Sequence, residues 1–282
     1  MNCKYCHSAN VIKFGQVKNV PRYFCKDCRR KFVSAGTIPK MQTGTATIAS
    51  VLDMYYKGMS ETAIRRALIQ QGSDRISTGT VYNWVRRFAG LARQETVGLV
   101  PKVGREWVAD ETLLRLVGRD VCFWDVIDKG THFLIASHMS LTRTVPDARE
   151  LMRQACTSAS AVPGVIYTDK LALYLTGLDS TPERGLKGEP RGLFSVGNNA
   201  SLIEHFHAAF KERTRIMHRL RSMDNIRWFM ESWLAHYNYF RPNAFLAGRT
   251  PADMAGIKFP FRTWKNFIEQ PYAKTTRIPS YL

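Results

Sequence analysis

The fold is decided by the stretch Arg105-Glu106-Trp107-Val108-Ala109-Asp110-Glu111-Thr112, which predicts a β-strand that carries Asp110. Two more runs rich in β-branched and aromatic residues follow at 121–127 and 131–136. The residues Asp128-Lys129-Gly130 between these runs are a hairpin signal. We therefore expect three antiparallel strands, the first of which carries an acid.

The region that follows predicts further helices and strands. A helix is expected at about 145–155, and a short buried strand at 165–168 ends at Asp169. Residues 192–196 are a candidate fifth strand, and a long helix that contains Glu204 follows. Three antiparallel strands, a helix, a parallel strand and a closing helix are typical of an RNase H-like α/β domain, a mixed sheet with helices.

The closing helix has one polar face. At about 3.6 residues per turn, Glu204, Lys211 and Arg215 fall within an arc of about 40°, and His207 lies beside them. Apolar residues occupy the other side and are expected to face the core: Ile203, Phe206, Phe210, Met217 and Leu220. An acid followed by two bases can hold a metal ion and, next to it, the phosphates of DNA.

Length and composition exclude several classes of protein. The chain has 282 residues, of which 45% are hydrophobic and 23% charged, so a largely disordered chain is excluded. It has no apolar run of eighteen residues, so no membrane-spanning helix is expected, and its first residues lack the apolar core of a secretion signal. Six cysteines in such a chain indicate a metal site or free thiols rather than disulfides.

The net charge of +18 favours a polyanionic partner, either nucleic acid or an acidic membrane surface. The charge is unevenly distributed: residues 1–40 carry +8, residues 41–104 carry +4 and residues 199–282 carry +7, whereas residues 105–198 carry −1. Basic arms therefore flank an acid-rich middle. A protein that merely coats a polyanion has no need of such an acidic segment.

Two CxxC pairs indicate a zinc ribbon at the N-terminus. Cys3 and Cys6 are separated by 18 residues from Cys25 and Cys28, a spacing that suits a tetrahedral four-cysteine site. Four thiolates leave no open position, so the expected Zn²⁺ is structural rather than catalytic. A redox pair or a chance arrangement is the alternative. The basic residues beside the second pair are either a solvated face or, as we expect, DNA contacts: Arg29, Arg30 and Lys31.

The next segment, residues 44–95, predicts three short helices. Gly58 ends the first, Ser60 caps the second, and Ser77 or Thr78 caps the third. A turn before the last helix is typical of a helix-turn-helix, in which that helix enters the major groove. The candidates for contact with bases or phosphates are Thr78, Thr80, Tyr82, Asn83, Arg86 and Arg87. A plain three-helix bundle with solvated basic residues is the alternative.

Three segments resemble the motifs of DDE transposases, the short prokaryotic insertion-sequence enzymes of the retroviral-integrase superfamily: residues 107–112 (WVADET), 166–170 (IYTDK) and 199–204 (NASLIE). The 34 residues between Asp169 and Glu204 are a spacing typical of that group, and Lys211 matches a basic position seven residues after the glutamate. Residues 237–243 and 248–252 also resemble the C-terminal pattern of the family, except that Asn243 replaces its common histidine.

The resemblance implies a catalytic triad of metal ligands. Asp110 would bridge two Mg²⁺ (or Mn²⁺) ions, and Asp169 and Glu204 would each complete one site. Two ions about 4 Å apart can activate an oxygen nucleophile and neutralise charge on the leaving oxygen. The expected reaction is hydrolysis at the 3′ end of the element, followed by attack of the freed 3′-hydroxyl on target DNA without a covalent protein–DNA link.

The resemblance also implies partners. The ribbon and the helix-turn-helix would bind double-stranded DNA at the terminal repeats of the element, and the catalytic domain would engage target DNA. Such enzymes pair two DNA ends, so we expect a homodimer or higher oligomer on DNA. We expect a cytoplasmic, nucleoid-associated prokaryotic protein with no membrane contact.

The expected domain order is a ribbon at 1–40, a helix-turn-helix at 41–96, a linker at 97–104, a catalytic core at 105–245 and an extension at 246–282.

Two other functions remain open: a DNA-binding regulator, including an inactive descendant of a transposase, and an RNase H-like nuclease with no joining step. Among the other acids, Glu111 alternates to the opposite face of its strand and is expected either to support the site from behind or to lie on the surface. Asp125 and Asp128 are interpreted as strand and turn residues.

Overall fold

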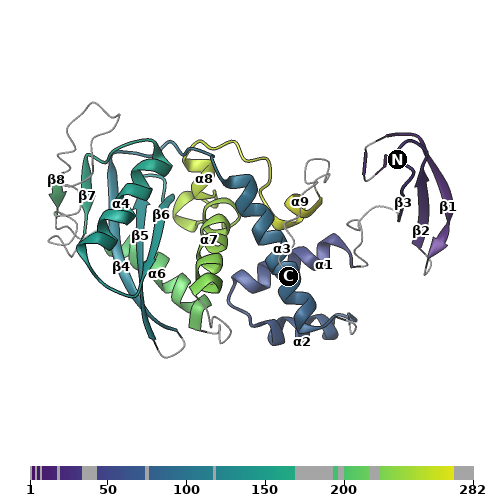
Figure 1. Cartoon of the computed structure of the whole chain (residues 1–282), viewed down its shortest axis with the longest axis horizontal. Helices are drawn as coiled ribbons and strands as arrows, with labels where there is room; N and C mark the ends of the chain where they lie inside the picture. Colours follow the sequence, from purple (N-terminus) through teal and green to yellow (C-terminus); the bar gives the residue numbers. More distant parts are fainter. Residues whose placement is uncertain are drawn as a thin grey trace. The chain divides into compact units, whose positions relative to one another are not determined.

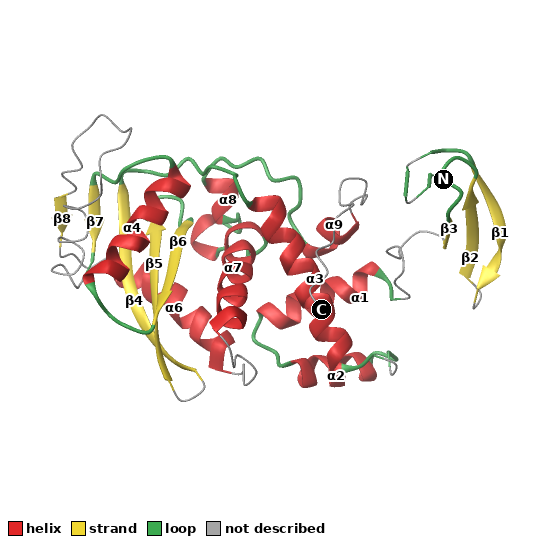
Figure 2. Cartoon of the chain, viewed as in Figure 1, coloured by secondary structure: helices red, strands yellow, loops and turns green. Residues whose placement is uncertain are grey.

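A computed structural model describes residues 2–3, 5–6, 8–17, 20–33, 43–73, 76–116, 119–168, 193–195, 200–215 and 223–269 (Figures 1 and 2). The chain divides into two compact units. The first comprises residues 1–53 together with 263–282, and the second comprises residues 54–262. In the part of the chain that is described, no helix is long and apolar enough to cross a membrane.

The larger unit is built on a five-stranded mixed sheet. The strand order is β6-β5-β4-β7-β8, with β5 antiparallel to both β4 and β6, and with β7 parallel to both β4 and β8. The five predicted strands are present, including the candidate fifth strand, but the third begins at Leu134 rather than at residue 131, because the turn after Asp128 extends to Phe133. Their bounds are β4 Glu106–Leu116, β5 Arg119–Asp128, β6 Leu134–Ser140, β7 Val165–Tyr167 and β8 Leu193–Ser195.

Helices pack against this sheet on its two faces. Helix α4 (Val145–Ala159) packs against β5 and β6, α6 (Ala200–Arg215) against β4, and α7 (Met223–Tyr239) against β6. Side chains alternate along β5, so neighbouring residues serve different helices. Trp124 donates its indole N–H to Ser140 beside the start of α4, whereas Asp125 contacts α6. The sheet therefore separates an α4 face from an α6 face.

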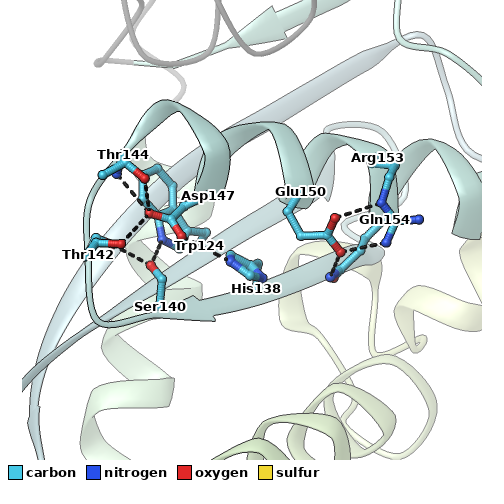
Figure 3. A network of polar contacts seen from close by, with 9 residues as sticks. All are labelled: Trp124, His138, Ser140, Thr142, Thr144, Asp147, Glu150, Arg153 and Gln154. Carbon is cyan, nitrogen blue, oxygen red and sulfur yellow. Dashed lines mark hydrogen bonds and ion pairs between the residues drawn. The ribbon is translucent and has the colours of Figure 1, made fainter. Parts of the chain in front are cut away.

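Polar contacts on the α4 face fix the start of that helix (Figure 3). The backbone N–H and the hydroxyl of Thr144 donate to Asp147 at 2.9 and 2.7 Å, as expected for a helix cap. One turn later, Arg153 and Gln154 donate to Glu150, and the Arg153 guanidinium lowers the pKa of Glu150 to about 2. These carboxylates are thus occupied in shaping α4.

Helices α2 (Glu61–Gln70) and α3 (Thr78–Thr96) precede the sheet in the larger unit. Ser60 and Ser77 cap them through hydrogen bonds from backbone N–H groups, as the sequence predicts. The predicted inner face of α3 is confirmed, because Val81, Trp84, Val85 and Phe88 are buried.

Helix α3 packs along α7 within the larger unit. The Arg93 guanidinium is 3.0 Å from the carboxylate of Glu231 in α7. Farther along α7, the His236 ring stacks on Tyr56 with centroids 4.1 Å apart, and burial lowers the pKa of His236 to about 3. His236 is therefore neutral at physiological pH and serves as a packing residue.

The N-terminal ribbon is a three-stranded antiparallel sheet. Strands β1 (Val11–Val17) and β2 (Val20–Cys25) pair antiparallel, with an irregular register between Lys13 and Gln16, where Gly15 has a positive φ of 77°. Strand β3 (Lys31–Val33) pairs with β2 and was not predicted, because its three residues lack a recognisable period.

Elsewhere in the same unit are α9 (Trp264–Glu269) and the first part of α1 (Thr45–Tyr56), linked by a hydrogen bond from the Thr45 hydroxyl to Glu269.

Two short helices follow α7 in the larger unit, a 3₁₀ turn η1 (Ala244–Leu246) and α8 (Pro251–Met254). Asn243 caps η1 by accepting the backbone N–H of Phe245 at 2.9 Å. Thr250 caps α8 in the same way, by accepting the backbone N–H of Asp253 at 3.2 Å. These caps fix the backbone after α7, where the segment forms one wall of a cavity described below.

Candidate active site

Two aspartates lie side by side on the α6 face of the sheet. Asp110 in β4 and Asp125 in β5 are direct partners in the antiparallel register. Directly opposed residues have Cβ atoms about 5 Å apart, and like charges at that distance destabilise a sheet unless something lies between them. His207 of α6 fills this position, with Nε2 3.1 Å from Asp125 Oδ2 and Nδ1 3.6 Å from Asp110 Oδ2.

The two carboxylates differ in their exposure. The side chain of Asp125 is 2% exposed and that of His207 is 7% exposed, whereas the side chain of Asp110 is 21% exposed. Asp125 also accepts a hydrogen bond of 2.5 Å from the Ser137 hydroxyl on β6. Asp125 is thus held on both sides inside the protein, and Asp110 is the member of the pair that solvent reaches.

Glu204 lies on α6 three residues before His207, and its side chain is exposed. Residues three apart are neighbours on a helix surface, so Glu204 lies next to the histidine that contacts Asp110. Lys211 is also exposed, as expected for the polar face of this helix, and Ile203, Phe206 and Phe210 are buried as predicted. Asp169, Met217, Leu220 and the side chain of Arg215 lie outside the described residues.

The acid–histidine contact was not predicted from the sequence. Asp125 was interpreted only as a strand residue and His207 only as a neighbour of the polar face. The register of the two strands is the signal that could have identified Asp125. When Asp120 of β5 is paired with Arg115 of β4, Asp125 lies opposite Asp110. The interpretation of Asp128 as a turn residue is confirmed, since it accepts the backbone N–H of Thr131 at 2.8 Å.

Glu111 lies on the α4 face, as the alternation predicts, but it is not a surface residue. It is buried, and its carboxylate forms an ion pair with Arg143. The pairing with an arginine compensates for the loss of hydration that burial imposes on the carboxylate. Glu111 is therefore turned away from Asp110 by the sheet itself.

A second cluster lies in the N-terminal ribbon. Four sulfur atoms all lie within 4.8 Å of one another, the Sγ atoms of Cys3, Cys6, Cys25 and Cys28. The Sγ atoms of Cys3 and Cys28 are 3.5 Å apart, as are those of Cys6 and Cys25. Four sulfurs at about 2.3 Å from one tetrahedral metal lie about 3.8 Å apart, so this geometry is compatible with a zinc ribbon.

Basic residues of the ribbon surround aromatic rings. The Arg30 guanidinium lies 5.0 Å from the centroid of the Tyr5 ring, and the Lys31 ammonium lies 4.1 Å from that of Phe14. Arg29, Arg30 and Lys31 are all exposed. The ribbon thus keeps the three predicted DNA contacts on its surface.

The candidate contacts on α3 are in different environments. Asn83 is exposed, and Thr78, Tyr82 and Arg87 are partly exposed. The Thr80 hydroxyl lies 2.9 Å from Ser77 Oγ in the helix cap.

Arg86 is held within the larger unit by α7. Its guanidinium lies 4.6 Å from the centroid of the Trp228 ring, and Nη1 is 3.4 Å from Asn225 Oδ1. These partners orient the Arg86 side chain along α7.

Comparison with known proteins bears on the same segment of the chain. The model of a family described as a DDE domain matches residues 104–241. No curated protein matches the chain. The HTLV-2 integrase catalytic core domain in complex with magnesium (trimeric form) is 14% identical, with a TM-score of 0.42 over 56% of this chain and 99% of that chain. The simian T-cell lymphotropic virus intasome in complex with PP2A regulatory subunit B56 gamma is 14% identical, with a TM-score of 0.39 over 82% of this chain and 77% of that chain.

The four-cysteine cluster leads to a direct prediction. Elemental analysis of the purified chain is expected to find about one zinc ion per molecule, and Cys25→Ser is expected to lose it, because structural zinc sites need all four thiolates. Cys156→Ser is the matched control, since that partly buried thiol lies on α4 and outside the cluster. Zinc retained in Cys25→Ser, or absent from the reduced wild type, would contradict the assignment.

Proposed function

We propose that the protein is a DNA transposase of the DDE type, because the model of a family described as a DDE domain matches its residues 104–241. It binds the terminal repeats of a mobile element, cleaves their 3′ ends and joins the 3′-hydroxyl to target DNA. The observation that carries the proposal is Asp110, a solvent-accessible carboxylate at the centre of the sheet with Glu204 on the helix above it.

The donor set fits hard divalent cations. Asp110 and Glu204 offer carboxylate oxygens, which Mg²⁺ and Mn²⁺ prefer. The third proposed ligand, Asp169, follows β7 by two residues, and β7 runs parallel to β4 with Tyr167 beside Val108. When bound, such ions would activate the attacking oxygen and neutralise charge on the leaving oxygen.

Asp125 and His207 have a supporting part in this proposal. The imidazole bridges a buried carboxylate and the accessible carboxylate of Asp110, so it limits the orientations that Asp110 can adopt. Outer-shell partners of this kind orient metal-binding carboxylates. We assign His207 as a positioning residue that acts through Asp110 rather than on the DNA.

The segments that precede and follow the acid-rich segment are positively charged, which favours binding of DNA. The residues before 105 carry a net charge of +12 and those from 199 onward carry +7, whereas the intervening segment carries −1. The ribbon, and α2 with α3 as a helix-turn-helix, would hold the element end through phosphate contacts, and Lys211 and Arg215 would contact the strand near Glu204. Two such ends would be paired by a homodimer or a larger assembly.

Asp110→Asn is expected to abolish cleavage and strand joining, because an amide cannot replace the negative charge that a bridging ligand must supply. The loss should be at least about a thousandfold, the scale on which essential catalytic groups act. The assay uses the purified chain, labelled element-end DNA and Mg²⁺, with DNA binding measured in parallel.

The control is Asp120→Asn, which removes an exposed carboxylate from β5 without touching the α6 face. It should cleave and join like the wild type. If wild type and Asp110→Asn both bind DNA and neither cleaves, the chain is a DNA-binding protein and not a transposase. Cleavage without joining of a precut 3′-hydroxyl end would instead identify a nuclease.

His207→Ala should raise the Mg²⁺ concentration that gives half-maximal cleavage by roughly tenfold, in line with the effect of outer-shell partners on metal sites. His207→Gln keeps a side chain that can contact Asp110 and should restore most of the affinity. If His207 had only a structural role, His207→Ala would yield less folded protein, and the folded fraction would depend on Mg²⁺ as the wild type does.

His138→Ala is the control for this variant, because His138 lies on the α4 face, 3.6 Å from Asp147. It should leave the Mg²⁺ dependence as it is in the wild type. An equal shift in both histidine variants would show that general destabilisation, and not the contact with Asp110, changes the metal requirement.

A further inference from the structure

A cavity of about 840 Å³ lies on the far flank of α6 from Glu204, bordered by the β5–β6 turn and the segment after α7. This volume is within the range of about 300–1,000 Å³ that small-molecule pockets have. At 100° per residue, Leu202 and Phe206 lie about 160° from Glu204 around the helix, and His205, the third lining residue on α6, lies about 100° from it. The cavity, which we name the α6 pocket, is therefore separate from the site of the acids.

Aromatic rings form much of the lining of the α6 pocket. Phe206 and Tyr237 are buried and pack edge to face with centroids 5.0 Å apart, which gives the pocket a rigid inner wall. Phe245 is 71% exposed, and its ring lies 5.4 Å from that of His205 and 6.3 Å from that of His132. Rings that line a cavity of this size offer stacking surfaces for a planar ligand.

The charged groups of the lining are positive. Among its described residues are Lys129 and Arg241, and none is acidic. The Lys129 ammonium is also 2.6 Å from Glu106, a neighbour outside the lining, and the Arg241 guanidinium lies 5.9 Å from the centroid of the Tyr237 ring. A lining of this kind favours an anion with a flat apolar part over a metal ion or a purely apolar ligand.

Asn243 orients the histidine in the lining. Its side-chain oxygen accepts the backbone N–H of Phe245 at 2.9 Å, so its amide nitrogen faces Nδ1 of His132 at 3.2 Å. The ring of His132 therefore accepts at Nδ1 and carries its proton on Nε2, which leaves a donor for a ligand. Burial lowers the pKa of His132, in agreement with a neutral ring.

The pocket and the acids lie on the same face of the sheet. Glu106, the partner of Lys129, and Asp110 are four residues apart on β4, so their side chains point to one face. The separation along the strand is about 13 Å at about 3.3 Å per residue. A DNA strand rises about 3.4 Å per nucleotide, so this distance corresponds to roughly four nucleotides.

We propose that the α6 pocket binds one unstacked nucleotide of the DNA strand that is held at the acids, with the base between the aromatic rings and the phosphate against Lys129 and Arg241. The proposal rests on the proposed function, since it takes the DNA substrate from there. It adds a site for single-stranded DNA within a few nucleotides of the reacting phosphodiester.

The test measures binding of fluorescein-labelled (dT)12, and of a 12-base-pair duplex, to the full chain by fluorescence anisotropy without added Mg²⁺. Phe245→Ala should weaken binding of the single strand on the order of tenfold, the effect of removing one stacking ring. Duplex binding should change less than twofold, because paired bases cannot enter the pocket. Arg241→Gln should lower the slope of log K against log salt for (dT)12 by about 0.7, the contribution of one phosphate contact.

The control is Leu141→Ala, which removes a side chain that is 52% exposed at the end of β6 and outside the pocket lining. It should bind both probes like the wild type. Unchanged (dT)12 affinity in a folded Phe245→Ala variant, or equal losses on single strand and duplex, would overturn the proposal. Because no step needs Mg²⁺, a chain that fails to cleave DNA can still pass this test, and an active transposase can fail it.

Discussion

The bridge from Asp125 through His207 to Asp110 fixes where α6 lies on the sheet, and the candidate site depends on it. Two aspartates are paired across β4 and β5, and the helix supplies the imidazole that lies between them. Glu204 lies three residues before His207 on the same helix and is exposed, so the proposed placement of Glu204 near Asp110 depends on how His207 holds α6. A shift of either strand by one residue would turn its acid to the α4 face. Register and helix position are therefore coupled through one side chain.

The same arrangement explains how a basic protein tolerates a cluster of acids. Asp125 is satisfied by Ser137 and His207 within the protein, so under the proposed function only Asp110 and Glu204 of these acids would attract cations from solvent. The basic segments on either side of the acid-rich region supply attraction for the DNA backbone. Divalent ions would then bring phosphate and carboxylate together, two groups that otherwise repel each other.

Local features of the fold were predictable from the sequence, whereas contacts between distant elements were not. The hairpin at Asp128 and the caps at Ser60 and Ser77 depend on a few neighbouring residues, and the structure confirms them. The burial of Glu111 depends on Arg143 from a distant loop, and the orientation of Arg86 depends on α7. Strand register and helix packing determine such contacts, and neither can be inferred from the hydrophobic periodicity of the sequence.

The candidate site shows the same division. Asp110 and Glu204 follow from the order and spacing of motifs, but the contact of His207 with Asp125 required the paired register of β4 and β5. The α6 pocket brings His132, His205 and Phe245 together from three separate elements. No sequence motif spans these residues, so only the folded chain reveals the pocket.

The most direct test of the central claim is anomalous diffraction from crystals of the chain grown with Mn²⁺ and DNA. Anomalous peaks are expected within coordination distance of the Asp110 carboxylate, about 2.2 Å, with oxygen atoms of Asp169 and Glu204 completing the sites. Asp125 and His207 should hold no ion. The absence of a peak at Asp110 in well-ordered, DNA-bound crystals, or a peak held by Asp125 and His207 instead, would contradict the claim.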